Sequence, residues 1–330
     1  MRMAIIDGIN QDIGLKILFP HADYYIDHTE IDKSRSLLSN NIDVKKDWSK
    51  INDQNYDVLF IIVALYDAKP NTKFFKQNIY DILQRELAII NKNNFKKVCV
   101  FDNYDYDYDP NEIVSNGKID LFFKRNYNKT KLYNPNVVPF PFIMFGEVSI
   151  IEKINCTDPS QSQSDPSQRL PSQSDMSAIE KIPRIIFSGS LFIHDDPQIG
   201  HYRNRKDMYN KIGRYIFNPG YLAYDTFLKQ IKMSMFALDL NGVGDPNKRT
   251  FEILSQGTLM IGEYNNLKWP FEERFSEETI FANEHEFFNK IEVLIGNPEI
   301  YKKCLDNQNE IYKKYFNKEW ISNYIVSKLA

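Results

Sequence analysis

Continuous runs of apolar residues alternate with stretches of helical periodicity along most of this chain. In the first half, the apolar runs predict strands at residues 3–7, 57–64, 97–101, 120–124 and 137–140. Between the second and third of these runs, apolar residues recur at helical spacing from Lys73 to Asn91 and predict a helix. Continuous apolar strands interleaved with helices are typical of a parallel sheet that is covered on both faces.

The same pattern starts again in the second half of the chain. Strands are predicted at residues 184–189, 215–217, 235–240 and 258–262. Helices are predicted around residues 205–212, around 225–233, around Arg249, and from Glu284 to about Lys328 with an interruption at 296–298. We therefore expect an α/β protein with two Rossmann-like, doubly wound domains that face one cleft. Ligands of such sheets bind outside the carboxyl ends of the strands.

A low-complexity stretch separates the two halves. Asp158-Pro-Ser-Gln recurs at Asp165-Pro-Ser-Gln, and Pro171-Ser-Gln-Ser-Asp repeats part of the motif. Such a composition buries too little apolar surface to offset its ordering entropy, so we expect disorder and no function of its own. The predicted boundaries are an N-terminal domain at 1–150, a disordered linker at 151–182, and a C-terminal domain at 183–330.

Composition excludes several classes of protein. The chain has 330 residues, 42% of them hydrophobic, which is enough for two domains with buried cores. A net charge of −3 does not favour nucleic acid as a partner. No apolar run approaches the roughly 20 residues that span a bilayer. The start of the chain is too brief for a signal peptide, and the three cysteines form no C-x-x-C pair, so we expect a reduced, cytoplasmic protein.

The most informative segment runs from Asp239 to Gly262. It predicts a buried strand, a loop rich in Gly, Asp, Pro and Asn, a short helix, a glycine stop at Gly257, and a second strand. The start of a helix suits an anion, and Arg249 adds a fork of donors for a diphosphate. Glu252, one turn later, could accept hydrogen bonds from a ribose diol. The segment therefore predicts a site for a nucleotide diphosphate, most specifically a sugar nucleotide, although an Arg and a Glu at this spacing are also common as a surface pair.

The run Lys248-Arg-Thr-Phe-Glu-Ile-Leu-Ser-Gln-Gly257 resembles the donor-site helix of GT-B glycosyltransferases, in which R-x-x-E precedes a small residue and a glycine. Trp269-Pro-Phe and Ile311-Tyr-Lys-Lys-Tyr-Phe316 resemble the closing portion of family-1-type members, and the C-terminal domain as a whole is family-1-like or family-4-like. The similarity is clearest over residues 184–325. It implies a hexosyltransferase, with the acceptor on the first domain and the donor on the second. It also implies a last helix, Trp320 to Leu329, that crosses back to the first domain.

Under this resemblance, the enzyme would move a sugar from a nucleoside-diphosphate sugar to a hydroxyl of a glycan, a lipid-linked sugar or a protein. No cofactor is expected besides the donor substrate. No metal is required either, because helix dipole and cationic side chains can stabilise the leaving diphosphate. His194-Asp-Asp-Pro197 and the aspartates of Tyr104-Asp-Tyr-Asp-Tyr-Asp109 are interpreted as loops rather than as metal sites.

The candidate donor-binding residues lie at the predicted carboxyl edge of the second sheet. They are Arg249, Glu252, Gly189, Ser190, Asn241, Gly242, Thr250, Phe251 and Arg205. The glycines would allow the backbone to approach phosphate oxygens closely. The main alternatives are structural: an ordinary turn at 188–190, and a solvated helix start at Arg205.

The catalytic base would be supplied by the first domain. An inverting transferase needs an acidic or histidine side chain beside the acceptor hydroxyl. Asp12 is the first candidate, Asp7 the second and Asp102 the third, all at predicted strand ends or loops of the first domain. Retaining members often carry two glutamates eight positions apart, and Gly244 occupies the position that would pair with Glu252.

A further segment of the first domain, Phe123-Lys-Arg-Asn126, places a cationic pair at a strand end. The pair could bind a phosphate or a charged acceptor, or it could be a surface turn. Two alternative functions use the same donor pocket: a non-catalytic nucleotide-sugar-binding protein, and a sugar-nucleotide epimerase. A dehydrogenase is not expected, because no G-x-G-x-x-G follows the first strand of either domain.

Overall fold

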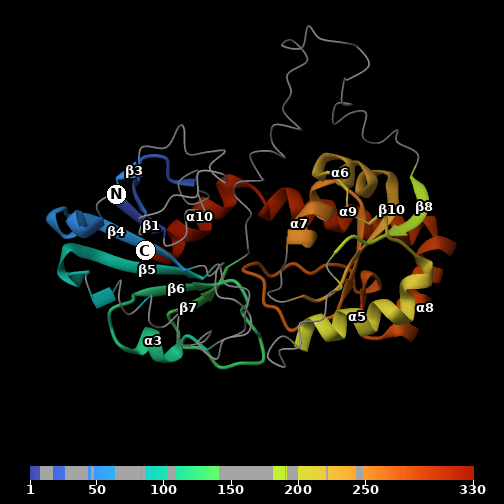
Figure 1. Ribbon diagram of the computed structural model, residues 1–330, viewed down its shortest axis with the longest axis horizontal. Coiled ribbons are helices and arrows are strands. Elements are labelled where there is room, and N and C mark those ends of the chain that lie inside the picture. Colours follow the sequence, from blue (N-terminus) through green and yellow to red (C-terminus); the bar gives the residue numbers. More distant parts are fainter. Residues whose placement is uncertain are drawn as a thin grey trace, which may run out of the picture.

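Two parallel sheets, one from each half of the chain, form the centres of the two lobes of the molecule (Figure 1). The structure is a computed structural model. The residues that it describes are 1–7, 18–26, 44–45, 48–63, 83, 87–88, 90–102, 109–140, 181–189, 191, 200–220, 222–242 and 248–330.

The first sheet has seven strands in the order β3-β2-β1-β4-β5-β6-β7, and every neighbouring pair is parallel. The strands are β1 (Met3–Asp7), β2 (Asp23–Ile26), β3 (Val44–Lys45), β4 (Tyr56–Val63), β5 (Phe95–Asp102), β6 (Leu121–Lys124) and β7 (Val137–Pro139). The helix α3 (Asn111–Ser115) and two 3₁₀ turns, Trp48–Asp53 and Lys92–Asn94, accompany them. The order reverses at β1, as in Rossmann-type sheets.

Alternate residues of these strands enter different cores, because successive side chains of a strand point to opposite faces. On β4, Leu59 and Ile61 pack with Ile113 and Val114 of α3 on one face. Val58 and Phe60 pack on the other face, in a core to which the C-terminal end of the chain contributes. Burial on both faces accounts for the continuous apolar runs of the sequence.

The second sheet has five strands in the order β12-β11-β10-β8-β9, and all its pairs are also parallel. The strands are β8 (Ile182–Ile186), β9 (Ile216–Phe217), β10 (Ser234–Asp239), β11 (Leu259–Glu263) and β12 (Ile280–Phe281). The helices are α5 (Gly200–Ile212), α6 (Tyr224–Met233), α7 (Lys248–Ser255), α8 (Glu284–Gly296) and α9 (Pro298–Tyr315), with 3₁₀ turns at Gly213–Tyr215 and Glu277–Thr279.

Helices cover both faces of this second sheet. Residues of α6 and α7 form one core with Ile186, Ala237 and Met260. Residues of α5 and α8 form the other core, with the alternate strand positions such as Phe236 and Leu238. The order of the strands reverses between β10 and β8, so the carboxyl ends of these two strands flank the crevice in which doubly wound sheets bind ligands.

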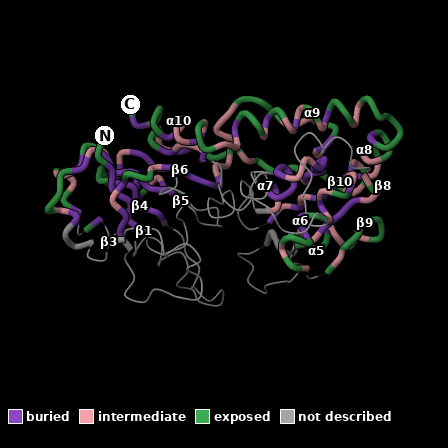
Figure 2. Tube along the Cα trace, turned by 90° about the horizontal axis from the view of Figure 1, so that it is seen from above, coloured by how far each residue is buried: buried purple, intermediate pink, exposed green. Residues whose placement is uncertain are grey.

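The last helix, α10 (Lys318–Leu329), crosses back to the first domain, as expected. Ile321, Ile325 and Leu329 are buried in the first domain's core. Tyr324 donates a hydrogen bond from its hydroxyl to the carbonyl oxygen of Pro139, 2.6 Å away, and Lys97 donates to the carbonyl oxygen of Leu329. Figure 2 shows α9 and α10 lying along the two lobes in succession, with exposed outer faces. The chain therefore ties its two domains together at its C-terminal end.

The predicted fold class, two Rossmann-like α/β domains, is confirmed. The C-terminal helical region has a second interruption that was not predicted, at Phe316 and Asn317, where the Asn317 side chain caps α10 by accepting a hydrogen bond from the amide of Trp320. Most of the predicted helix at 73–91 and residues 151–180 of the predicted linker lie outside the described residues, and the domain boundaries stay predictions. Among the helices that the structure describes, none is long and apolar enough to cross a membrane.

Candidate functional site

The carboxyl edge of the second sheet brings most of the described donor-site candidates together. β10 ends at Asp239 and leads to Asn241 and Gly242, and α7 begins at Lys248 on the far side of the connecting loop. The loop residues 243–247 and Ser190 lie outside the described residues. Gly257 follows α7 with a φ of 59°, and its amide donates to the carbonyl oxygen of Leu254, which confirms it as the helix stop.

Arg249 and Glu252 form an ion pair on the first turns of α7. Nη1 of Arg249 lies 3.2 Å from Oε2 of Glu252, and their side chains are 21% and 4% exposed. The Arg249 guanidinium also stacks over the ring of Phe227 from α6, 4.3 Å from the ring centre. Burial lowers the pKa of Arg249, and the Glu252 and Asp239 carboxylates oppose that shift. The surface-pair alternative is therefore wrong: Glu252 is buried, and Arg249 is largely covered by α6.

Arg205 is not a solvated helix start, because α5 begins five residues earlier, at Gly200. Its Nε donates to the carbonyl oxygen of Asn241 at 2.9 Å, and its Nη2 donates to that of Leu240 at 3.1 Å. A Cβ at Gly242 would lie 2.1 Å from Nη2 of Arg205, so only glycine allows the guanidinium to lie there. Arg205 thus brings a positive charge to the end of β10, close enough to Arg249 to lower its pKa.

Asn241 connects this edge to the segment that follows β11. Its amide donates to Oε2 of Glu263 at 3.0 Å, and its side chain donates to the carbonyl oxygen of Tyr264 at 2.9 Å. Burial raises the pKa of Glu263, and the hydrogen bond from Asn241 opposes that shift. Thr250 donates from its hydroxyl to Oδ2 of Asp239 at 2.5 Å, which fixes the start of α7 to the end of β10.

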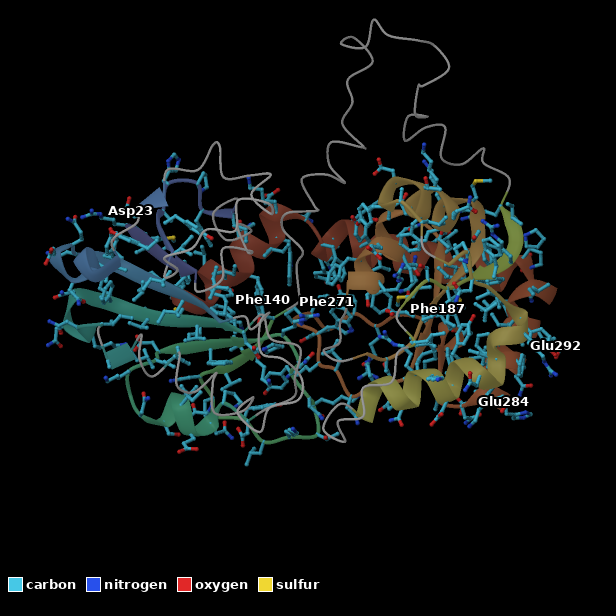
Figure 3. The ribbon with its side chains drawn as sticks, viewed as in Figure 1. Asp23, Phe140, Phe187, Phe271, Glu284 and Glu292 are labelled. Carbon is cyan, nitrogen blue, oxygen red and sulfur yellow. The ribbon has the colours of Figure 1, made fainter. Side chains whose placement is uncertain are left out.

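Gly189 and Phe251 have structural roles in this arrangement. A Cβ at Gly189 would lie 2.9 Å from the ring of Phe187, which Figure 3 labels within the second lobe, so the glycine admits that ring. Phe251 is 9% exposed and packs edge-to-face on Phe316, with ring centres 5.4 Å apart. Neither observation tests a contact with a ligand, and both residues stay predicted donor contacts.

A cavity of about 640 Å³ opens beside the start of α7. The cavity lies beside the ends of β10, β11 and β12, and residues of the segment 264–277 form much of its wall. Asn241 and Thr250 also line it. Sequence reasoning missed two of its acidic residues, Asp239 and Glu263, although both end adjacent strands and the strand-end rule could have found them. Phe271, which lines the cavity, lies between the two lobes in Figure 3.

The first domain reaches this cavity through a backbone contact between the lobes. Asn128 and Leu267 form an antiparallel bridge. The amide of Lys129 donates to the carbonyl oxygen of Asn266, and that of Lys268 donates to that of Tyr127, both at 2.8 Å. Lys129 lines the cavity as well, with Nζ 5.1 Å from the centre of the Tyr264 ring. We call this contact the interdomain clasp.

The base candidates of the first domain have different outcomes. Asp12 lies outside the described residues. Asp7 ends β1, at the carboxyl edge, and its side chain is not described. Asp102 ends β5, and its Oδ2 lies 3.3 Å from Nζ of Lys124, with neither side chain exposed. The surface-turn alternative for residues 123–126 is wrong, because Lys124, Arg125 and Asn126 are all buried.

Within the described ranges, no group of three or more His, Cys, Asp or Glu side chains could hold a metal ion. The segments 104–109 and 194–197, which were interpreted as loops without metal, lie mostly outside those ranges. The independence from metal therefore stays a prediction.

Comparison with solved structures decides the fold. No family model and no curated protein matches the sequence. The complex of Anabaena Alr3699/HepE with UDP is similar over 100% of this chain and 99% of its own, with a TM-score of 0.53 and 11% identity. The lipopolysaccharide outer core galactosyltransferase WaaB covers 99% of this chain and 100% of its own, with a TM-score of 0.52 and 10% identity.

A UDP-forming α,α-trehalose-phosphate synthase from Burkholderia xenovorans is similar to the same extent. It covers 99% of this chain and 98% of its own, with a TM-score of 0.52 and 10% identity. The chain has the GT-B fold. In this fold, Arg249 and Glu252 lie on α7, which begins at the crevice of the C-terminal domain. The sequence resemblance predicts the donor site at the same place.

Proposed function

We propose that this chain is a glycosyltransferase that moves a hexosyl group from a nucleoside-diphosphate sugar to a hydroxyl of a glycan, a lipid-linked sugar or a protein. The observation that carries the proposal is the position of Arg249 and Glu252 on the first turns of α7, at the crevice of a GT-B domain. The UDP bound to HepE and the name UDP-forming synthase support a uridine nucleotide, and the name galactosyltransferase supports transfer of a hexose.

The proposed chemistry uses charges that already lie at this edge. Negative charge develops on the departing diphosphate, and a positive group that is positioned in advance stabilises it most effectively. Arg249 would turn its donors to the diphosphate, with the helix start and the charge of Arg205 beside it. Glu252 would accept from the ribose diol. We propose that no metal and no cofactor takes part, and the cytoplasmic location stays a prediction.

The base would come from the first domain. Asp12 and Asp7 keep their order as candidates. Asp102 would have to leave its ion pair with Lys124, since its side chain has no exposed surface in the present arrangement. This burial favours a second candidate function, a non-catalytic protein of the same fold that binds the sugar nucleotide without turnover. An epimerase would differ from both by interconverting sugar nucleotides without any acceptor.

The proposal is tested by titration calorimetry with UDP and with a panel of UDP-hexoses. Arg249→Lys keeps a cation beside Glu252 but loses the planar fork, so we expect at least tenfold weaker UDP binding in a folded protein. Arg184→Lys is the matched control, because Arg184 also stacks on a phenylalanine, 4.2 Å from the centre of the Phe217 ring. Its donors go to Ser234 and Gln230, away from the crevice.

Two further readings separate the candidate functions. Release of UDP from a bound UDP-hexose, stimulated by an acceptor, supports the transferase. Tight binding with no release supports the non-catalytic protein, and conversion to a second UDP-hexose supports the epimerase. Absence of any UDP or UDP-hexose binding, or equal loss of binding in Arg249→Lys and Arg184→Lys, contradicts the donor site.

A further inference from the structure

The two domains are connected in two places that differ in how much surface they bury. At the joint between α9 and α10, rings of both helices pack with a ring of the segment that follows β11. Phe271 stacks on Tyr315, with ring centres 4.2 Å apart, and Tyr315 packs edge-to-face on Trp320 at 5.0 Å. From this joint, α10 enters the core of the first domain. Because buried apolar surface is the main favourable contribution to folding, this connection is the stable one.

The interdomain clasp is the second connection, and its bonds lie near the solvent. Lys129 donates its amide to the carbonyl oxygen of Asn266, and Lys268 donates to that of Tyr127, both at 2.8 Å. None of these four residues is buried. A single hydrogen bond adds little net stability, and segments with exposed backbone bonds and few buried apolar contacts open at low free energy. The clasp can therefore open while the joint stays packed.

Each half of the clasp is held in shape within its own domain. In the first domain, Oδ1 of Asn128 accepts from the amide and the hydroxyl of Thr130, at 3.0 Å and 2.8 Å. In the second domain, Oδ1 of Asn265 accepts from the amide of Leu267 at 3.2 Å, and the Asn265 side chain donates to Oδ1 of Asn241 at 3.3 Å. Because both halves are preorganised, they can pair without the help of a ligand.

The clasp also belongs to the wall of the cavity that reaches the crevice. Lys129, Leu267 and Lys268 line the same cavity as Asn241, which follows β10, and Thr250, on the first turn of α7. Opening the clasp would therefore change access to the end of β10 and to the start of α7.

We propose that the interdomain clasp is a latch. The chain rests with its domains closed in the absence of any ligand, and the clasp opens about the α9–α10 joint to admit and to release the molecule that binds at the crevice. Closure comes from the bonds of the clasp itself and needs no nucleotide. The identity of the admitted molecule rests on the proposed function, whereas the latch does not.

Asn128 and Leu267 allow the latch to be locked by a disulfide. They are a non-hydrogen-bonded pair of an antiparallel bridge, because the two backbone bonds join their neighbours. The Cα atoms of such a pair are about 4.5 Å apart, which a disulfide can span. Asn128→Cys/Leu267→Cys is compared with Asn128→Cys/Lys268→Cys, in which a shift by one residue turns the second side chain to the other face. Both variants also carry Cys156→Ser, and the two remaining native cysteines are buried.

The first measurements use the full chain without nucleotide. In a glutathione redox buffer, we expect the in-register pair to form its disulfide at least tenfold faster than the control pair. Small-angle X-ray scattering should give the oxidised and the reduced in-register variant the same radius of gyration, because the reduced chain is already closed. Equal rates of disulfide formation in the two variants, or an oxidised chain that is more compact than the reduced one, would overturn the latch.

UDP binding to the in-register variant tests the gating role. Oxidation should slow both the association and the dissociation of UDP at least tenfold, and reduction should restore both rates. Rates that stay the same on oxidation would overturn the gating role. If the wild type and the reduced variant both fail to bind UDP, the proposed function is contradicted, and the disulfide and scattering measurements still decide whether the clasp is a latch.

Discussion

Removing the Arg249–Glu252 ion pair in two steps separates its contribution to folding from its contribution to binding. Arg249→Met leaves the Glu252 carboxylate, 4% exposed, without the guanidinium that lies 3.2 Å away. Breaking a buried pair by removing one partner costs about 3–5 kcal/mol. Arg249 is 21% exposed, so we expect the lower end, about 3 kcal/mol, or roughly a 100-fold larger unfolding constant.

The double variant Arg249→Met/Glu252→Leu replaces both charges by apolar side chains. Such a replacement of a buried pair is often neutral or stabilising. We therefore expect the double variant to be more stable than Arg249→Met, with a coupling free energy between the two positions of about 2 kcal/mol. Urea unfolding followed by circular dichroism gives the free energy of unfolding of the wild type, of the variants Arg249→Met and Glu252→Leu, and of the double variant.

Binding should not recover with stability. If the pair also holds a nucleotide, the folded double variant binds UDP at least 100-fold more weakly than the wild type, because both the fork and the carboxylate are gone. A double variant that is folded and binds UDP like the wild type would refute the donor site. A coupling free energy below about 0.5 kcal/mol would refute the buried pair itself.

Three further predictions concern the fold. Ile325→Ala should destabilise the first domain by about 3 kcal/mol, because Ile325 is 0% exposed in that core. Val326→Ala, on the outer face of the same helix, should cost less than about 0.5 kcal/mol, and urea unfolding compares the two variants. Asp102→Asn should cost about 3 kcal/mol because Lys124 stays buried, and a variant as stable as the wild type that has lost only turnover would instead make Asp102 a catalytic base. Burial lowers the pKa of Lys181 to about 8, so between about pH 8 and 10.5 the folded chain binds fewer protons at this residue than the unfolded chain. Over that range, the free energy of unfolding of the wild type relative to that of Lys181→Met should rise with pH. Urea unfolding at several pH values measures this difference, and a difference that does not change with pH contradicts the prediction.

Most strands of both domains could be predicted because their central residues are buried on two faces and therefore form an apolar run, whereas β2, β3 and β12 were not predicted. β2 was missed because its sequence, Asp23-Tyr-Tyr-Ile26, begins with a charged residue and contains two hydroxyl-bearing residues, so it does not stand out as an apolar run. Tyr56 donates from its hydroxyl to Oδ2 of Asp23 at 2.5 Å, and Tyr25 shares a hydrogen bond with Tyr56 at 2.8 Å. The Asp23 carboxylate and the Tyr25 hydroxyl of β2 are thus hydrogen-bonded by Tyr56 of β4. A pattern within residues 23–26 does not contain this partner.

The register between strands, which a local sequence pattern does not contain, also limited the prediction of the site. Asp102 and Lys124 were considered separately, as a base and as part of a cationic pair. They are direct partners in the ladder between β5 and β6, and this pairing places their side chains in contact. Lys129 could not be predicted as a cavity residue, because its position depends on the clasp with Asn266 in the other domain.

Helix α7 could be predicted because one short segment contains its start, its charged pair and its stop. The spacing of Arg249 and Glu252 did not show that each is the other's partner in the absence of a ligand. A diphosphate that takes the guanidinium must supply at least the free energy that the ion pair loses, and the ribose must do the same for Glu252. Under the proposed function, binding at this site would be an exchange of partners, so single substitutions should change folding and affinity together and only the double variant would separate them.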